Sequence, residues 1–365
     1  MKISEIIQVL EKVAPLSYQE SYDNAGLLTG NSGWQCTGIV CSLDSTEAVI
    51  LEAKAKACNL VVTHHPIIFG GLKKINGKNY VEKAVIAAVK NDIAIYAIHT
   101  NLDNVMAGVN SRMADQLGLI NRQILLPKSG QLTKLFTFVP IAQAEQVRSD
   151  LFEAGAGHIG NYSEASFNTP GTGTFKAAEG ANPFIGEIGS RHTENEIKME
   201  IIFPNYLKNN IISTLLKSHP YEEVAYDLVS LANDHQQVGS GLIGELPEPI
   251  AEEIFLNKIK EAFRLSIIRH TNLLGKPVKK VALCGGAGSF LISKAAAAGA
   301  DFFITADVKY HEFFDANDWL VIADIGHWES EQYTIDLLFD ILTLNFPNFA
   351  VLKTGVRTNP VYYFS

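Results

Sequence analysis

Short apolar runs alternate with amphipathic segments along the first part of the chain, up to about residue 125. Three of these runs predict strands: Gly38–Leu43, Asn59–Thr63 and Ile93–Ile98. Helical patterns after Ser45 and around Val81–Lys90 separate the strands. Continuously apolar strands that alternate with helices are typical of a parallel sheet with helices on both faces. We therefore expect an α/β fold here.

The same pattern returns in the last part of the chain. Four further runs predict strands, and two segments between them predict helices. The strands are Lys280–Cys284, Asp301–Thr305, Trp319–Asp324 and Phe349–Lys353, and the helices are Ser289–Ala298 and about Trp328 to Leu342. We expect residues 1–128 and 236–365 to build one α/β domain, with a parallel or mixed sheet that helices cover on both faces.

Residues 129–235, between these two parts, have a different pattern. They contain three predicted strands and two predicted helices. The strands are Leu135–Val139, Glu196–Phe203 and Val224–Leu228, and the helices are Gln143–Ala154 and Leu207–Leu216. This order resembles a ferredoxin-like α+β module. The Gly-, Asn-, Thr- and Ser-rich stretch from Gly155 to Asn195 predicts a long polar loop, which is typical of functional or mobile segments. An α+β domain inserted into the α/β domain is therefore expected.

Composition narrows the functional class. Hydrophobic residues make up 47% and charged residues 19% of 365 residues, as in globular proteins. The 30 Lys and Arg against 39 Asp and Glu give a net charge of −9, and no basic run is present, so no nucleic-acid partner is expected.

No stretch approaches the roughly 20 apolar residues of a membrane span. The four cysteines form no CxxC pair, which predicts reduced thiols in a cytoplasmic protein.

Histidines and carboxylates directly follow three of the predicted strands. They are His64 and His65, then His99 and Asp103, and then His327 and Glu331. Ligands of open parallel sheets gather at the carboxyl ends of the strands. These side chains are therefore candidates for one shared metal site.

Each pair also has an ordinary structural interpretation. Neighbouring residues of a strand point to opposite faces, so His64 and His65 serve one site only if the chain turns after the strand. Asp103 could cap a helix, and His327 and Glu331, four residues apart, could be a solvent-facing helix pair. The coincidence of three such groups at strand ends favours the metal site.

The residue types indicate the class of metal. Imidazoles and carboxylates without a thiolate suit Zn, Mn, Fe, Co or Ni, and they argue against a structural zinc site of the cysteine type. Three histidines and two carboxylates are more than one catalytic ion needs. The set could hold two ions if one carboxylate bridged them, which is the arrangement of two-metal hydrolysis.

Short motifs in every part of the chain carry a family resemblance. In the α/β domain they are Tyr22–Leu28, Thr63–Pro66 with Phe69–Gly71, His99–Asp103, Gly285–Ser289, Thr305–Asp307 through His311, and Gly326–His327 with Glu331. In the middle they are Gly171–Phe175, Asn182–Gly186 and His219–Glu223. On these motifs the chain resembles the Nif-three-like family, the GTP cyclohydrolase I type 2 homologues. Its middle resembles the PII/CutA-like domain inserted in longer bacterial members.

The resemblance implies a dinuclear metal site. His65 and Asp103 would hold one ion, His64 and His327 the other, and Glu331 would bridge them. The resemblance also implies self-association into a ring-shaped homohexamer, a trimer of dimers whose metal sites face a central cavity.

Four further features near the site allow more than one interpretation. His99 could be a proton shuttle, a partner that orients a metal ligand, or an ordinary hydrogen-bonded histidine. His311 is a candidate general acid–base. Gly285–Ser289 could cradle a phosphate, or form a tight turn with its serine as helix cap. Glu329 could compete with the bridging carboxylate.

Together these observations predict a metal-dependent hydrolase that acts on a nucleotide or a related substrate. The resemblance implies ring opening of GTP with release of formate. An alternative is a non-catalytic metal-binding or regulatory scaffold, which a PII/CutA-like insert would suit. A third interpretation, nucleic-acid handling in a toroidal cavity, is disfavoured by the net charge of −9.

Overall fold

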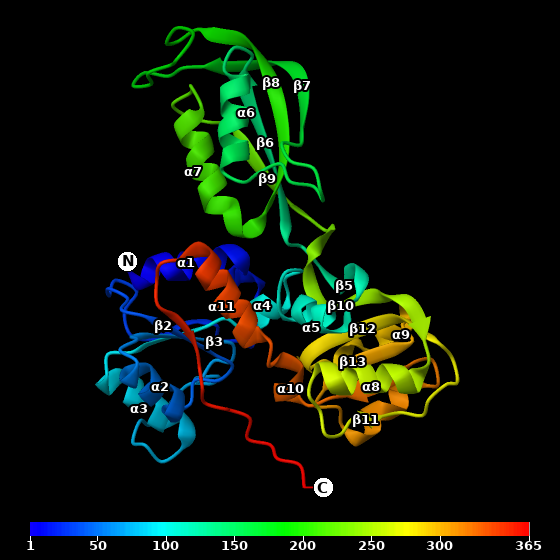
Figure 1. Cartoon of the computed structure of the whole chain (residues 1–365). Helices are drawn as coiled ribbons and strands as arrows, with labels where there is room; N and C mark the ends of the chain where they lie inside the picture. Colours follow the sequence, from blue (N-terminus) through cyan, green and yellow to red (C-terminus); the bar gives the residue numbers. More distant parts are fainter. Residues whose placement is uncertain (365) are drawn as a thin grey trace. The chain divides into compact units, whose positions relative to one another are not determined.

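Figure 1 shows a computed structural model of the protein, which describes residues 1–364. The chain forms two compact units. The first unit combines Met1–Pro127 with the chain from Gln237 onward, and the second consists of Lys128–Gln236. None of the described helices is both long enough and apolar enough to span a bilayer.

The first unit contains a five-stranded sheet with the order β1-β4-β3-β2-β15. The strands are β1 (Gly26–Thr29), β2 (Ile39–Ser42), β3 (Leu60–Thr63), β4 (Ala94–Ala97) and β15 (Val351–Lys353). All neighbouring pairs are parallel except β1 with β4. Each central strand is buried at every position, as its continuous apolar run predicts.

Helices cover both faces of this sheet (Figure 1). On one face lie α1 (Ile3–Val13) and α11 (Thr334–Asn345), which pack on strand residues such as Ile39. On the other face lie α2 (Glu47–Ala55) and α3 (Tyr80–Lys90), which pack on Val40. Successive residues of a strand thus supply two separate cores.

A second, six-stranded sheet of the same unit has the order β11-β14-β13-β12-β10-β5. Its strands are β5 (Ile120–Ser129), β10 (Asp234–Ile250), β11 (Arg269–His270), β12 (Val278–Ala287), β13 (Phe302–Ala306) and β14 (Val321–Asp324). Strands β12, β13 and β14 are parallel, whereas β10 runs antiparallel to β12 and β11 runs antiparallel to β14. Helices α5 (Val109–Leu117) and α8 (Glu252–Ala262) cover one face, and α9 (Ile292–Ala297) with η4 (Tyr310–Ala316) covers the other.

These two sheets confirm the α/β class and correct the expectation of a single sheet. The sequence pattern shows the parallel strands but not β5 and β10, because half-buried polar positions interrupt their apolar runs. The C-terminal strand β15 pairs with β2 rather than with the late strands that precede it. The unit is therefore mixed α/β with more than one sheet.

The second unit is a four-stranded antiparallel sheet with the order β7-β8-β6-β9. In chain order its elements are β6 (Leu132–Pro140), α6 (Ala144–Glu153), β7 (Ser166–Lys176), β8 (Arg191–Pro204), α7 (Lys208–Ser218) and β9 (Tyr226–Leu231). This βαββαβ order is that of a ferredoxin-like module. Both helices pack on one face of the sheet.

The expected loop from Gly155 to Asn195 is wrong over much of its length. It contains all of β7 and the beginning of β8, which pair in continuous register from Ser166 with Ile201 to Lys176 with Arg191. The pattern concealed this hairpin because β7 lacks an apolar face and contains two glycines and a proline, residues that are rare in strands.

Candidate metal centre

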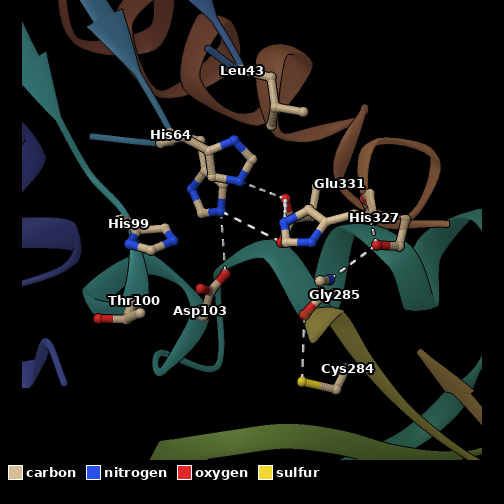
Figure 2. Close-up of polar contacts among 12 residues, drawn as sticks. Leu43, His64, His99, Thr100, Asp103, Cys284, Gly285, His327 and Glu331 are labelled. Carbon is tan, nitrogen blue, oxygen red and sulfur yellow. Dashed lines mark hydrogen bonds and ion pairs between the residues drawn. The ribbon is translucent and has the colours of Figure 1, made fainter. Parts of the chain in front are cut away.

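Three segments from distant parts of the chain deliver the candidate ligands to one place (Figure 2). His64 and His65 follow β3 directly. Asp103 ends the short helix α4 (Thr100–Asp103), which begins three residues after β4. His327 and Glu331 are the first and last residues of α10 (His327–Glu331), which follows β14. The carboxyl ends of parallel strands from both sheets thus supply the cluster.

The carboxylate of Glu331 lies at the centre of these side chains and is 3% exposed. Its Oε2 lies 2.9 Å from Nε2 of His65 and 3.2 Å from Nε2 of His327. Its Oε1 lies 3.8 Å from Nε2 of His64. The two oxygens of one buried carboxylate therefore face different histidines.

Asp103 completes the side of the cluster that contains His64. Its Oδ1 lies 3.6 Å from Nε2 of His64, whose side chain is fully buried. Both atoms are buried and have no hydrogen-bond partner in the described part of the chain. Because buried polar atoms without partners are costly, their presence here fits a site that holds a cation.

Two ligand sets share Glu331. One consists of His64, Asp103 and Glu331, and the other of His65, His327 and Glu331. Within each set the potential ligand atoms lie within 4.8 Å of one another. The pairing implied by the family resemblance is different, because it joins His65 with Asp103 and His64 with His327.

The reason for the difference is that successive residues after β3 turn toward opposite neighbours. Nδ1 of His64 contacts the main-chain oxygen of Ile98, on the β4 side, at 2.9 Å. Nδ1 of His65 contacts Oδ1 of Asp44, on the β2 side, at 2.8 Å. His64 is thereby directed toward Asp103, which follows β4, and His65 is directed away from it.

Two further carboxylates orient the second ligand set. Asp44 accepts from Nδ1 of His65, and its Oδ2 accepts from Oγ1 of Thr358 at 2.5 Å. Oδ2 of Asp307 accepts from Nδ1 of His327 at 2.6 Å. Such carboxylate–histidine contacts fix the tautomer and leave Nε2 available to bind a metal. Asp44 is not apparent as a site residue from the sequence, because it is a single acid two residues after a strand.

His99 lies beside both ligand sets. Its ring centre is 5.2 Å from that of His64 and 5.5 Å from that of His65. Oδ1 of Asp23 accepts from Nδ1 of His99 at 2.8 Å, and the other oxygen accepts from the Thr100 main chain and hydroxyl. Burial would raise the pKa of Asp23, but these hydrogen bonds outweigh it and lower the pKa to about 2. A permanently charged Asp23 therefore holds His99 in place.

The ionisable groups of the cluster shift one another's pKa values. Burial and the charge of Glu331 raise the pKa of Asp103. Burial opposes the charged form of Glu331, yet His327 and His65 hold its pKa well below the ordinary value. Burial alone would lower the pKa of His65, but the contacts with Glu331 and Asp44 outweigh burial and raise this pKa to about 10. A divalent cation would take the place of these protons, so metal binding here releases protons.

Comparison with known proteins identifies the family. Residues 1–360 match the Duf34/NIF3 (NGG1p interacting factor 3) family. The chain belongs to the Duf34/NIF3 family. This result confirms the resemblance found in the sequence motifs.

Curated relatives and a solved structure match nearly the whole chain. The chain is 43% identical over 332 residues to a protein of Halalkalibacterium halodurans named GTP cyclohydrolase 1 type 2 homolog, covering 90% of this chain and 89% of the relative. It is 38% identical to the protein of that name from Bacillus subtilis, covering 89% and 87%. A Bacillus cereus protein related to NIF3 covers 100% of this chain and 99% of its own, with 35% identity and a TM-score of 0.88.

Two residues singled out in the sequence lie outside the cluster of this Duf34/NIF3 protein. His311 is exposed in η4, where its ring contacts Tyr310 and Phe314, and neither described ligand set includes it. Glu329 points elsewhere, and its Oε1 accepts from the side-chain amide of Asn359 at 2.8 Å. The structure therefore does not bring either side chain to the metal ligands.

The glycine-rich segment Gly285–Ser289 contacts the cluster through its backbone. Gly286 has φ +61°, and a Cβ there would overlap with Oε1 of Glu331. Its main-chain N–H donates to Oγ of Ser330 at 2.9 Å. The glycine thus permits the close approach of β12 to α10, and the expected helix cap by Ser289 is not formed, because Gly288 occupies the cap position.

A cavity of about 430 Å³ adjoins the second ligand set. His65 and His327 form part of its wall, together with Arg269, Trp328 and Tyr363. The Arg269 guanidinium donates to Oδ2 of Asp324 at 3.0 Å and remains half exposed. The cavity is large enough for a small polar molecule, with charged and aromatic groups in contact with it.

Proposed function

We propose that this protein holds two divalent metal ions and uses them to hydrolyse a nucleotide or a related substrate. One observation carries the proposal: the two oxygens of the buried Glu331 carboxylate face two different ligand sets. His64 and Asp103 would hold one ion, His65 and His327 the other, and Glu331 would bridge them. The buried, unpartnered atoms of His64 and Asp103 support this assignment.

In the proposed reaction, the metals and the side chains of the protein have different roles. Two bound cations would lower the pKa of a water molecule and stabilise negative charge on a substrate oxygen. Asp44 and Asp307 keep Nδ1 of His65 and His327 in the donor state, so that Nε2 can act as a ligand. His99, fixed by Asp23, is placed to accept or return a proton.

The ligand types narrow the choice of metal. Each set contains imidazole and carboxylate groups and no thiolate. Zn, Mn, Fe, Co and Ni are the metals that suit such a mixed set. Metal analysis of protein purified without a chelator would identify the native ion.

GTP is the first substrate to test, because the relatives of this chain are named GTP cyclohydrolase 1 type 2 homologs. The proposed reaction opens the imidazole ring of the guanine base by hydrolysis and releases the carbon between the two ring nitrogens as formate. The remaining diaminopyrimidine would rearrange through its ribose and close to a dihydropterin triphosphate. Metal-loaded protein would be incubated with GTP, and formate and pterin fluorescence would be followed. Turnover no greater than that of His64→Ala would exclude GTP as the substrate, and a panel of nucleotides and phosphoesters would then be tested.

The second candidate is a non-catalytic metal-binding or regulatory scaffold. The ferredoxin-like second unit favours it, since we infer that this unit is an inserted domain of the PII/CutA-like kind. Full occupancy by a tightly bound metal, with no hydrolysis of any compound in the panel, would support the scaffold and overturn the hydrolase.

We also propose that the protein acts in the cytoplasm as a homohexamer built as a trimer of dimers. Large apolar side chains remain exposed on the single chain, among them Tyr162, Trp319 and Leu344. Self-association would bury such surface. Sedimentation equilibrium would measure the mass, and a monomer at micromolar concentration would contradict the hexamer.

A further inference from the structure

The second unit contains its own cavity, of about 720 Å³. It lies on the face of the sheet opposite α6 and α7. Alternate residues of β8 establish this, because Met199 and Ile201 pack with the helices whereas Glu196 and Lys198 line the cavity. Strand β7 and the segment around Tyr221 form the other walls.

Glu196 supplies a buried carboxylate to this cavity and is 8% exposed. Its Oε1 accepts from the Tyr221 hydroxyl at 2.9 Å. Among the described residues no donor contacts Oε2, which lies over the backbone of Gly173, where a Cβ would overlap with it. Glu196 lines the cavity, so Oε2 is available there to a positively charged group, and such pairing offsets the cost of burying the carboxylate.

The hydrogen-bond partner of Glu196 is held rigidly. The Tyr221 main-chain N–H donates to Nδ1 of His219 at 3.1 Å, and Nε2 of His219 donates to the Phe138 main-chain oxygen at 3.0 Å. Burial lowers the pKa of His219, so its ring is neutral at pH 7 and can accept at Nδ1. Tyr221 is therefore positioned by the fold before any ligand arrives.

Three aromatic rings surround the approach to the carboxylate. The centre of the Tyr221 ring lies 5.8 Å from that of Phe175 and 6.3 Å from that of Phe184, with interplanar angles of 60° and 51°. Asn182 donates its main-chain N–H to Oε2 of Glu222 at 2.9 Å, which ties the segment bearing Phe184 to the opposite wall. At these distances the rings pack on one another and form a continuous aromatic wall, whose faces attract a cation.

The charges around the cavity favour the same class of ligand. Three carboxylates line it, from Glu196, Glu222 and Glu223, against the amines of Lys176 and Lys198. The Lys198 amine is already paired, at 3.2 Å from Oε1 of Glu200 and 4.7 Å from the centre of a phenylalanine ring. The cavity thus presents a net negative charge to a ligand.

We propose that the second unit binds a small organic cation, namely a quaternary or protonated amine carried on an apolar body. The cationic nitrogen pairs with Glu196, and the apolar body lies among Phe175, Phe184 and Tyr221. This site is separate from the Glu331 ligand sets and requires no metal.

Calorimetric titration of the full chain with benzyltrimethylammonium tests the proposal. The matched compound is its neutral isostere, in which a tert-butyl group replaces the trimethylammonium group. We expect one saturable site per chain for the cation and binding at least about tenfold weaker for the isostere, because the isostere lacks the charge that Glu196 and the aromatic faces attract. Equal binding of both compounds, or no binding of the cation at millimolar concentration, would overturn the proposal.

Three variants locate the site. Glu196→Gln keeps an acceptor for Tyr221 but removes the charge, and should weaken binding about tenfold. Phe184→Ala, at an exposed position that the fold tolerates, should weaken it about threefold. Glu145→Gln is the matched control, because Glu145 is an exposed carboxylate on α6, on the opposite face of the sheet, and is outside the cavity lining. Equal losses in Glu145→Gln and Glu196→Gln would also contradict the assignment.

Discussion

The Glu331 ligand sets and the Glu196 cavity differ in the groups that surround a carboxylate of low exposure. Around Glu331, histidines from distant parts of the sequence surround one carboxylate and hold its pKa well below the ordinary value. Glu196 contacts one hydroxyl, and three aromatic rings line the same cavity. Among the described hydrogen bonds, no imidazole contacts this carboxylate. The first arrangement suits small, highly charged metal ions, and the second suits a large, weakly hydrated organic cation.

The largest expected effect comes from Glu331→Gln. This substitution keeps the side-chain shape but removes the charge that both ligand sets share. Because changes to outer-sphere partners already cost about ten- to a hundredfold in metal affinity, losing the bridging charge should cost more than about a hundredfold for both ions. Elemental analysis after dialysis should find almost no metal, while binding of benzyltrimethylammonium stays unchanged. A variant that retains both metals would show that Glu331 does not bridge them.

Asp44→Asn should affect one ligand set only. Asp44 orients His65 and has no contact with His64 or Asp103 among the described hydrogen bonds. We expect an affinity loss of about ten- to a hundredfold for one ion, seen as a fall from two bound metals per chain toward one. Asp340→Asn, which removes an exposed ion pair with Arg112, serves as control and should keep both. Equal loss of the two ions would mean that the ligand sets are not separable.

A smaller effect, confined to the second unit, is expected from pH. Burial lowers the pKa of His219 in the folded state below its unfolded value of about 6.5. The unfolded chain then binds more protons, so the stability that the neutral ring provides is present above pH 6.5 and is lost as the pH falls through the folded pKa.

Hydrogen exchange of β8 peptides at pH 7.5 and 5.5 would measure this loss of stability. Protection should decrease at the lower pH in the natural chain and change less in His219→Gln, which cannot be protonated. An identical pH dependence in both proteins would exclude His219 as its source.

The smallest effect is expected for His311→Ala. The side chain is exposed, and its described ring contacts are with neighbouring residues of the same short helix. Metal content and turnover should stay within about twofold of the natural chain, whereas loss of a general acid–base such as His99 should cost about a hundredfold or more. A large loss of turnover in His311→Ala with metal retained would restore it as a candidate acid–base.

The sequence predicts the candidate metal centre better than it predicts the sheets. Polar residues after apolar strands are visible as pattern, and parallel strands bring such positions to one edge, so His64, Asp103 and Glu331 do converge. The pattern cannot show which neighbour each of two adjacent histidines faces. It also cannot distinguish Asp44 from any other acid near a strand end.

Predictions for the second unit failed where strand propensity is weak. β7 is rich in Gly, Thr and Asn, so it reads as a loop, although β8 pairs with it over its full length. One of its glycines, Gly173, makes room for Glu196. The small residues that make β7 look like a loop in the sequence therefore also shape the cavity. Only the pairing of β7 with β8 makes the strand and the cavity apparent.

Anomalous diffraction from crystals grown with Mn²⁺ or Zn²⁺ tests the central claim most directly. Two peaks per chain are expected on either side of the Glu331 carboxylate, one beside His64 and Asp103 and the other beside His65 and His327. A single peak, or peaks away from Glu331, would contradict the two-ion centre and the hydrolytic role built on it.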